Sequence, residues 1–222
     1  MKWIENPPVC VLLANQFNPS IFTSNWLSKH GILDEQGTYK PESVFTSQLV
    51  QVVTEDFALV ITQDQLQLML LKPEEYSNPE QQSRMIEKIL GVIICKLPEI
   101  PYVALGLNFN WHLQLKAEDI PAQSRMWFGK QSQGIFKRFD SSDAKFGAYL
   151  SKDIGRFRMK LSALPIIVSS LREERFQFSF NFHHDIAEIE GKPDLLASLI
   201  ADWSSVRIEA IETIKLAAFR ES

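Results

Sequence analysis

The sequence lacks most of the features by which a protein's function is usually recognised. Its 222 residues include only 9 glycines and 2 cysteines. None of them forms a phosphate-binding Gly-x-x-x-x-Gly-Lys loop, a dinucleotide-binding glycine fingerprint, a Gly-x-Ser-x-Gly elbow or a Cys-x-x-Cys pair. No apolar run is long enough to span a bilayer, and residues 1–6 are charged rather than hydrophobic, so we expect no signal peptide and a cytoplasmic location. The usual grounds for proposing an enzyme, a cofactor or a membrane protein are therefore missing.

The cysteines and the net charge further limit which kinds of site and partner we expect. Cys10 falls in an apolar strand and Cys95 in an apolar helix, so we expect both to be small buried side chains rather than a disulfide or a metal pair. The formal net charge of −4 disfavours bulk attraction to nucleic acid or to an anionic membrane, although it leaves a local basic patch open. We expect neither a metal nor a cofactor.

The clearest element is a long strand at residues 101–116. Its apolar residues recur at every second position, which predicts one dry face and one polar face. The stretch 101–110 also echoes the stretch 8–18, because both open on proline, carry Leu at the fifth position and Asn at the eighth, and close on Phe-Asn. This echo suggests an internal repeat.

The order of the predicted elements also suggests an internal repeat. In the first half we expect a strand, a helix at 21–30, strands at 44–54, 57–62 and 65–71, and a helix that opens at Asn78-Pro79. In the second half we expect the long strand, a helix at 117–129, a mobile loop at 131–142, strands at 145–151, 156–164, 166–169 and 175–184, and one helix at 193–219.

These patterns predict an α+β fold made of two tandem strand-helix-meander-helix repeats, residues 1–98 and 99–222, which form one compact unit. If both repeats share one antiparallel sheet, the helices cover one face. That arrangement resembles, in architecture only, the saddle of the TATA-binding-protein fold. The resemblance implies no DNA binding, because a fold does not carry a function.

Several stretches together resemble a sporadically distributed family of uncharacterised bacterial proteins. The residues that carry this resemblance are Pro7-Pro8-Val9 with Phe17 and Pro19, the run Leu49 to Val52, the run Gly106 to Asn110, and an alternating strand followed by a long terminal helix. The resemblance covers nearly the whole chain. It implies a similar fold and brings no catalytic residues and no assigned activity.

A shared polar face of the sheet is one candidate binding site. Polar residues on the long strand, the late strand and the second meander would point the same way if their registers agree, namely Asn108, Asn110, His112, Arg156, Arg158, Asn181 and His183. Such a face could bind an anionic or amide-bearing ligand through Arg forks and Asn amides. The alternative is an ordinary solvated sheet face, which needs polar residues in any case. The run His183-His184-Asp185 suggests a metal, but adjacent strand residues point to opposite faces.

A second candidate is a protein interface around residues 127–139. Aromatic side chains mixed with arginine are typical of protein interfaces, and this segment contains Trp127, Phe128, Phe136, Arg138 and Phe139. The leading hypothesis is therefore a non-catalytic interaction protein or accessory subunit, with a protein partner or a second copy of itself. The alternatives are small-ligand or nucleic-acid binding on the polar face, and an enzyme with an unfamiliar site around His112 and His183.

Overall fold

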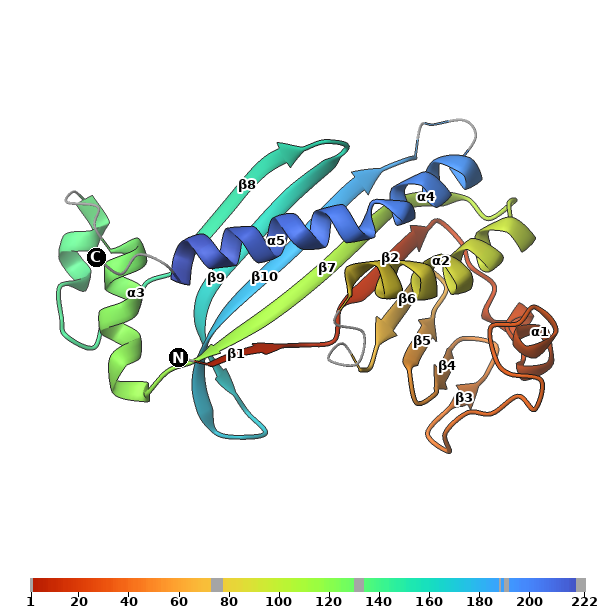
Figure 1. Ribbon diagram of the computed structural model, residues 1–222, viewed down its shortest axis with the longest axis horizontal. Helices are drawn as coiled ribbons and strands as arrows, with labels where there is room; N and C mark the ends of the chain where they lie inside the picture. The colour runs from red at the N-terminus through yellow and green to blue at the C-terminus, as the bar shows by residue number, and fades with distance from the viewer. Residues whose placement is uncertain (1, 73–77, 130–133, 188, 190–191, 219–222) are drawn as a thin grey trace. The chain divides into compact units, whose positions relative to one another are not determined.

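A computed structural model describes residues 2–72, 78–129, 134–187, 189 and 192–218 of the chain. The described residues combine helices with antiparallel strands, which confirms the α+β class (Figure 1). They form two compact units. Unit 1 comprises residues 1–6, 109–181 and 210–222, and unit 2 comprises residues 7–108 and 182–209. Three elements have residues in both units: β7 (Tyr102–Gln114), β10 (Glu173–Asp185) and α5 (Trp203–Ala218).

Unit 2 contains the strand meander that was predicted from strand-forming residues and short separators at 44–71. Its strands are β2 (Val9–Ala14), β3 (Val44–Phe45), β4 (Val50–Val53), β5 (Phe57–Ile61), β6 (Gln65–Leu70) and residues 102–108 of β7. They lie in the order β3-β4-β5-β6-β2-β7. Every second side chain of β4, β5 and β6 is buried, because successive residues point to opposite faces.

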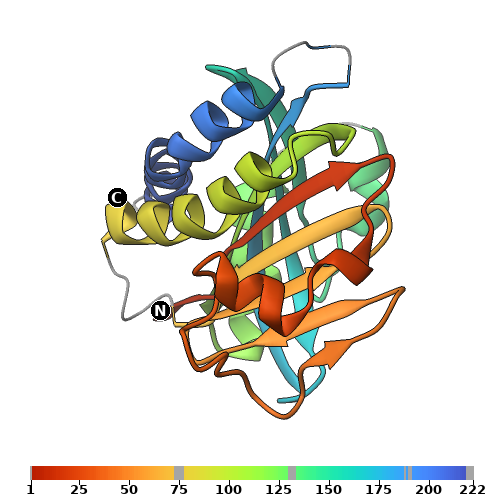
Figure 2. The ribbon, with the colours of Figure 1, turned by 90° about the vertical axis from the view of Figure 1, so that its right-hand side faces the viewer.

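The helices of unit 2 bury their apolar faces against this sheet. The helical segments are η1 (Pro19–Ile21), α1 (Ser24–Lys29), α2 (Pro79–Lys96), α4 (Lys192–Ala201) and the start of α5. Asn78 caps α2 by accepting a hydrogen bond from the backbone N–H of Glu80 at 2.9 Å. Figure 2 shows α2 and α4 on the same face of the strands. The indole N–H of the buried Trp203 donates to Gln82 of α2 at 3.2 Å.

Unit 1 is built from three separate segments of the chain. It contains β1 (Lys2–Glu5), residues 109–114 of β7, η2 (Ala117–Asp119), α3 (Ile120–Phe128), η3 (Gly134–Phe139), β8 (Ala148–Ile154), β9 (Phe157–Val168), most of β10 and the end of α5. The strands lie in the order β7-β10-β9-β8, and β1 pairs with β7. The core is largely aromatic, with Phe109, Trp111, Phe176, Phe178 and Phe180 all buried.

The two halves of the chain share one strand order. In each, the opening strand lies next to the last strand of the meander: β2 lies next to β6, and β7 lies next to β10. The division into repeats 1–98 and 99–222 and the saddle-like architecture nevertheless stay predictions, since a common order of strands does not by itself establish a duplication. The two compact units follow different boundaries from those repeats.

Several predicted elements differ in detail from those observed. The strand predicted at 44–54 is two strands, because the Thr46 hydroxyl accepts from the Leu49 N–H at 3.0 Å and closes a turn between them. The helix predicted at 193–219 is two helices, α4 and α5, with Asp202 between them. The segment predicted at 21–30 is η1 followed by α1. Cys95 is exposed rather than buried.

The strands predicted between residues 145 and 184 also differ from those observed. Arg156 lies in the turn between β8 and β9 and not in a strand, whereas β9 runs unbroken through Pro165 to Val168. The proline is tolerated because the pairing with β8 ends at Ala163, so no β8 carbonyl needs its missing N–H. Of the loop expected to be mobile, residues 131–133 lie outside the described residues, and 134–139 form η3.

Candidate functional site

Of the residues predicted to form a polar face, Asn110 belongs to a hydrogen-bonded network within unit 1. The Ser179 hydroxyl of β10 donates to the Asn110 side-chain oxygen of β7, and the Gln177 amide donates to Ser179 at 2.6 Å. All three residues are half-buried. Because these polar groups already have protein partners, they leave little hydrogen-bonding capacity directed at a ligand.

His112 lies on the same face, and its ring is hydrogen-bonded to Asn6, which directly follows β1. Its Nε2 lies 3.0 Å from the Asn6 side-chain amide, which donates when that nitrogen is unprotonated. Burial lowers the pKa of His112, and the nearby Arg175 guanidinium lowers it further. Arg175 in turn donates to Glu173 at 2.6 and 3.0 Å. This bonding, with a further hydrogen bond from Gln114, lowers the pKa of Glu173.

The predicted arginines are not gathered beside these residues. Arg158 of β9 donates to Asp153 of β8 at 3.0 Å, and Arg156 lies in the adjacent exposed turn. In the strand order β10 separates β9 from β7. Two strand spacings amount to roughly 10 Å. In the structure Arg158 is directed towards Asp153 rather than towards Asn110.

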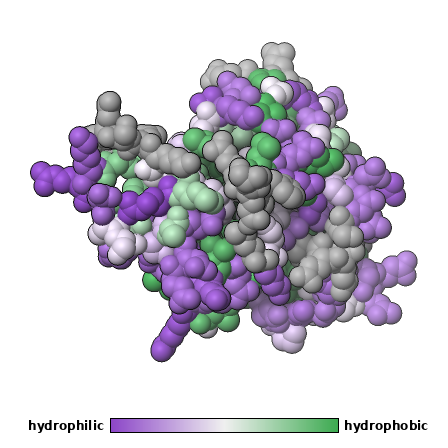
Figure 3. Space-filling model, turned by 60° about the vertical axis from the view of Figure 1, so that its left-hand side comes forward, coloured by the Kyte–Doolittle hydropathy of each residue, from purple (hydrophilic) through white to green (hydrophobic). Residues whose placement is uncertain are grey.

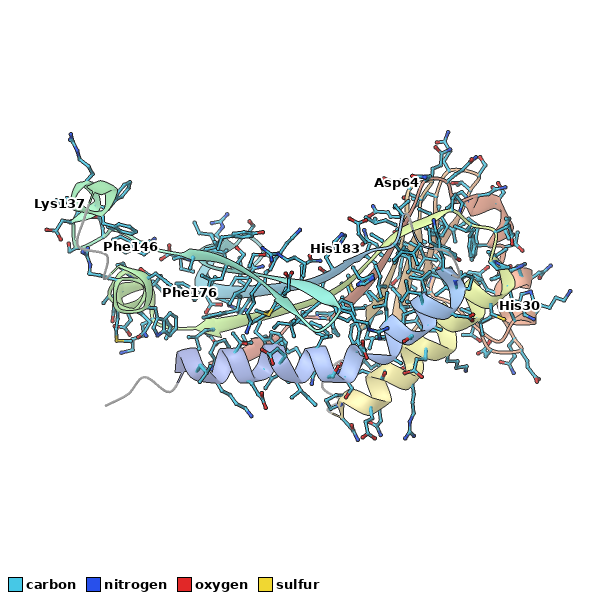
Figure 4. All side chains as sticks on the ribbon, turned by 90° about the horizontal axis from the view of Figure 1, so that it is seen from above. His30, Asp64, Lys137, Phe146, Phe176 and His183 are labelled. Carbon is cyan, nitrogen blue, oxygen red and sulfur yellow. The ribbon has the colours of Figure 1, made fainter. Side chains whose placement is uncertain are left out.

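The other predicted face residues are divided between the units. Asn181 belongs to unit 1, whereas Asn108 and His183 belong to unit 2. The Asn108 amide donates to the Val9 carbonyl at 3.3 Å. Figure 4 shows His183 on the strand face opposite α2, and its Nε2 lies 3.9 Å from the Asp185 carboxylate.

The predicted aromatic interface is mostly packed inside unit 1. The Trp127 ring makes edge contacts with Phe176 and Phe178 at centroid distances of 5.2 and 5.8 Å. Phe128 stacks on Phe176 at 5.8 Å, and Phe136 stacks on Phe146 at 5.9 Å. Arg138 and Phe139 are exposed on η3, as is Lys137, which points away from α3 in Figure 4. Three of the five predicted interface side chains thus have ring partners within their own unit.

The structure reveals a different surface, the free edge of β8. This strand is the last in the strand order, and among the described residues its strand partner is β9. Residues 149–153 are all exposed, including Tyr149 at 65% and Leu150 at 54%. An edge strand presents a row of unpaired backbone N–H and C=O groups to a prospective partner. The opposite edge strand, β3, is only 2 residues long and offers much less.

Apolar side chains gather next to this edge. Five of the twelve exposed large hydrophobic residues in the described part of the chain are Tyr149, Leu150, Leu164, Ile167 and Leu171. Tyr149, Leu164 and Ile167 line a groove of about 720 Å³ beside the beginning of β8. Figure 3 shows that hydrophobic residues reach the molecular surface in separate patches among hydrophilic ones. β8 and β9 supply both the edge and part of the groove lining, which residues 145–147 and Glu174 of β10 complete.

A cavity of about 640 Å³ in unit 2 is a weaker candidate. Buried Phe57 and Ile89 contribute to its lining. At its rim Lys40 pairs with Glu55 at 3.2 Å. A backbone hydrogen bond from Thr38 to the Asp34 carboxylate, 2.7 Å long, lowers the pKa of that acid. Arg84, Lys88 and Asp56 also line the cavity, so its lining mixes charges of both signs and defines no class of ligand.

The described residues provide neither a group of metal ligands nor a membrane-spanning helix. Among the described residues, no three His, Cys, Asp or Glu side chains are grouped so that they could hold a metal ion. No helix in the described part of the chain has both the length and the hydrophobicity to cross a membrane. In comparisons with known proteins, no family model, no curated protein and no solved structure matches the chain.

Proposed function

We propose that the protein is a non-catalytic interaction subunit that binds a protein partner by strand addition at the free edge of β8. One observation carries the proposal: β8 is an edge strand of 7 residues whose residues 149–153 are all exposed, next to exposed apolar side chains of β9. In strand addition the main chain supplies affinity, and the side chains on either face supply specificity.

The exposure of the β8 edge is the reason to propose that a partner strand binds there. Natural proteins usually protect a free edge by shortening the strand, by placing proline, a bulge or charged side chains in it, or by covering it, and of these devices β8 has only the charges of Lys152 and Asp153. β8 has no proline, and its pairing with β9 runs without a register shift from Ala148 to Ile154. A long regular edge with Tyr149 and Leu150 exposed is suited to pairing with another strand.

The interaction role also agrees with the lack of catalytic motifs in the sequence, and we propose a cytoplasmic location. Small-ligand binding on the polar face is not favoured by a specific observation, because Asn110 and Ser179 bond to each other. Nucleic acid remains disfavoured by the net charge of −4. We retain the resemblance to an uncharacterised bacterial family as an expectation only.

The experiment compares two proline variants of the tagged full chain. In Ser151→Pro, proline blocks the outer edge of β8, and edge strands tolerate proline where the N–H faces outward. Ser47→Pro is the matched control, since Ser47 is exposed in the turn between β3 and β4. We expect the wild type and Ser47→Pro to retain a bound protein, either a second copy or a protein from the native host, and Ser151→Pro to lose it.

The control measurement is the far-UV circular dichroism and melting temperature of each variant, which must show that Ser151→Pro stays folded. Retention of every partner by a folded Ser151→Pro variant would overturn the proposal. So would a wild type that binds neither a second copy nor a host protein.

A further inference from the structure

We propose that the partner at β8 is a second copy of this chain, joined in an antiparallel, two-fold pairing centred on Ser151. This inference rests on the proposed function, strand addition at β8, and goes further by naming the partner and the register. It is carried by the backbone geometry of the β8–β9 hairpin and by the side-chain sequence of β8 itself.

The turn determines which backbone groups of β8 face outward. Gly155 adopts φ of 55° at the first position of a two-residue turn with Arg156, the pattern of a type II′ hairpin. In such a hairpin the residues that flank the turn, Ile154 and Phe157, form a hydrogen-bonded pair, and hydrogen-bonded pairs then recur at every second residue. The outward N–H and C=O groups of β8 therefore belong to Tyr149, Ser151 and Asp153.

A pairing centred on Ser151 uses all of these outward groups. Ser151 faces Ser151 of the second copy, and Tyr149 faces Asp153 of the second copy on both sides of the two-fold axis. Each of these hydrogen-bonded pairs exchanges two backbone bonds. A pairing centred on Leu150 or on Lys152 would leave outward groups at one end of the strand without a partner.

The side chains of β8 are also complementary in this register. On one face Tyr149 lies opposite Asp153, so its phenol can donate to that carboxylate, which already accepts from Arg158 at 3.0 Å. On the other face the exposed Leu150 lies opposite the aliphatic stem of Lys152, and Ala148 lies opposite Ile154. No two like charges face each other. A pairing centred on Lys152 would instead place two lysines directly opposite, which is destabilising.

The first test uses two variants that differ only in the sign of a charge. Leu150→Lys places a lysine opposite Lys152 of the second copy, whereas Leu150→Glu places an acid there, and both lose the same apolar side chain. We expect Leu150→Lys to raise the dimer dissociation constant about tenfold above that of Leu150→Glu, because the altered pair occurs twice in the symmetric dimer. Sedimentation equilibrium over a wide range of protein concentration measures both constants.

The second test is disulfide trapping, carried out in a Cys95→Ser background because Cys95 is exposed. In a hydrogen-bonded antiparallel pair the Cα atoms lie about 5.5 Å apart, within the range that a disulfide spans. Ser151→Cys should therefore form a covalent dimer under mild oxidation. Leu150→Cys is the register control and should cross-link much less, since it faces Lys152 rather than its own copy.

The outcomes separate this inference from the proposed function. A wild type that stays monomeric at every concentration, but binds a host protein that Ser151→Pro loses, would overturn the second copy as partner and leave strand addition standing. A dimer with equal dissociation constants for Leu150→Lys and Leu150→Glu, and with cross-linking at Leu150→Cys rather than at Ser151→Cys, would overturn the register. A dimer that survives Ser151→Pro would overturn this inference, and retention of every host protein by the same folded variant would overturn the proposed function as well.

Discussion

The aromatic ring of Trp127 packs against other rings, whereas its indole N–H is buried without a hydrogen-bond partner among the described residues. Its ring contacts Phe128, Phe176 and Phe178. Its indole nitrogen is buried and has no hydrogen-bond partner among the described residues. A buried donor without a partner costs about 1–3 kcal/mol. The ring contacts therefore stabilise unit 1, and the unpaired N–H offsets part of that stabilisation.

Two substitutions at Trp127 separate these contributions. Trp127→Phe keeps an aromatic ring and removes the unpaired N–H, so we expect the free energy of unfolding to change by no more than about 1 kcal/mol. Trp127→Ala removes the ring contacts and should cost about 2–4 kcal/mol. Urea unfolding followed by far-UV circular dichroism measures both. Equal losses in the two variants would contradict this division between ring and N–H.

His112 makes the stability of the fold depend on pH. Burial, together with Arg175, holds its pKa below the ordinary value of 6.5 in the folded chain. As the pH falls below 6.5, the unfolded chain binds a proton that the folded chain does not yet bind. The contribution of His112 to stability is therefore complete above pH 6.5, and it is lost as the pH falls from there towards the lowered pKa.

The variant His112→Gln should remove this dependence, because it keeps a polar side chain opposite Asn6 and cannot titrate. We expect the difference in unfolding free energy between wild type and variant to be constant above about pH 7 and to shift against the wild type below about pH 6. Urea unfolding at several pH values measures that difference. A difference that stays constant across the whole range would show that His112 titrates alike in the folded and unfolded chains.

At the scale of elements, the sequence was most informative where one face of a strand or helix is buried. Period-two alternation predicted β7 and β10, because each has a dry and a polar side. Strand-forming residues between short separators predicted β5 and β6. The cap at Asn78 predicted the start of α2 correctly. The helix break at Asp202 was missed, because apolar residues continue on one side across it and no glycine or proline marks it.

The candidate site was harder to predict, since it depends on which strands become neighbours. The alternation placed Asn110 and His112 on a polar face, but their bonding to Ser179 and Asn6 follows from register, which no local pattern reveals. The burial of Trp127 likewise depends on Phe176, far away in the sequence. The exposed edge was missed because only the strand order makes β8 an outer strand. The exposed pair Tyr149-Leu150 was the one local signal available.

At the scale of the whole molecule, the chain passes repeatedly between the two compact units. Unit 1 is assembled from three segments and unit 2 from two, and β7, β10 and α5 each contribute residues to both. No single cut in the chain releases either unit as a continuous piece. Each unit therefore loses part of its own core when a shared strand or helix unfolds.

This continuity predicts that both units unfold in one cooperative transition. Differential scanning calorimetry at a fixed protein concentration should give one endotherm whose calorimetric and van't Hoff enthalpies agree. The concentration must be fixed because self-association raises the melting temperature. Variants in either unit should then shift the whole endotherm, at roughly 2–4 °C per kcal/mol for a chain of this size.

Trp127→Ala supplies the variant for unit 1 and Gln82→Leu the variant for unit 2. Gln82→Leu leaves the buried indole N–H of Trp203 without its acceptor, which should cost about 1–3 kcal/mol. Gln81→Leu is the matched control, because Gln81 is exposed one residue earlier on α2 and should change little. Two resolved endotherms, each moved only by the variant in its own unit, would show that the shared strands do not couple the units. A single endotherm moved by both variants would show that stability lost in either unit is lost by the whole chain.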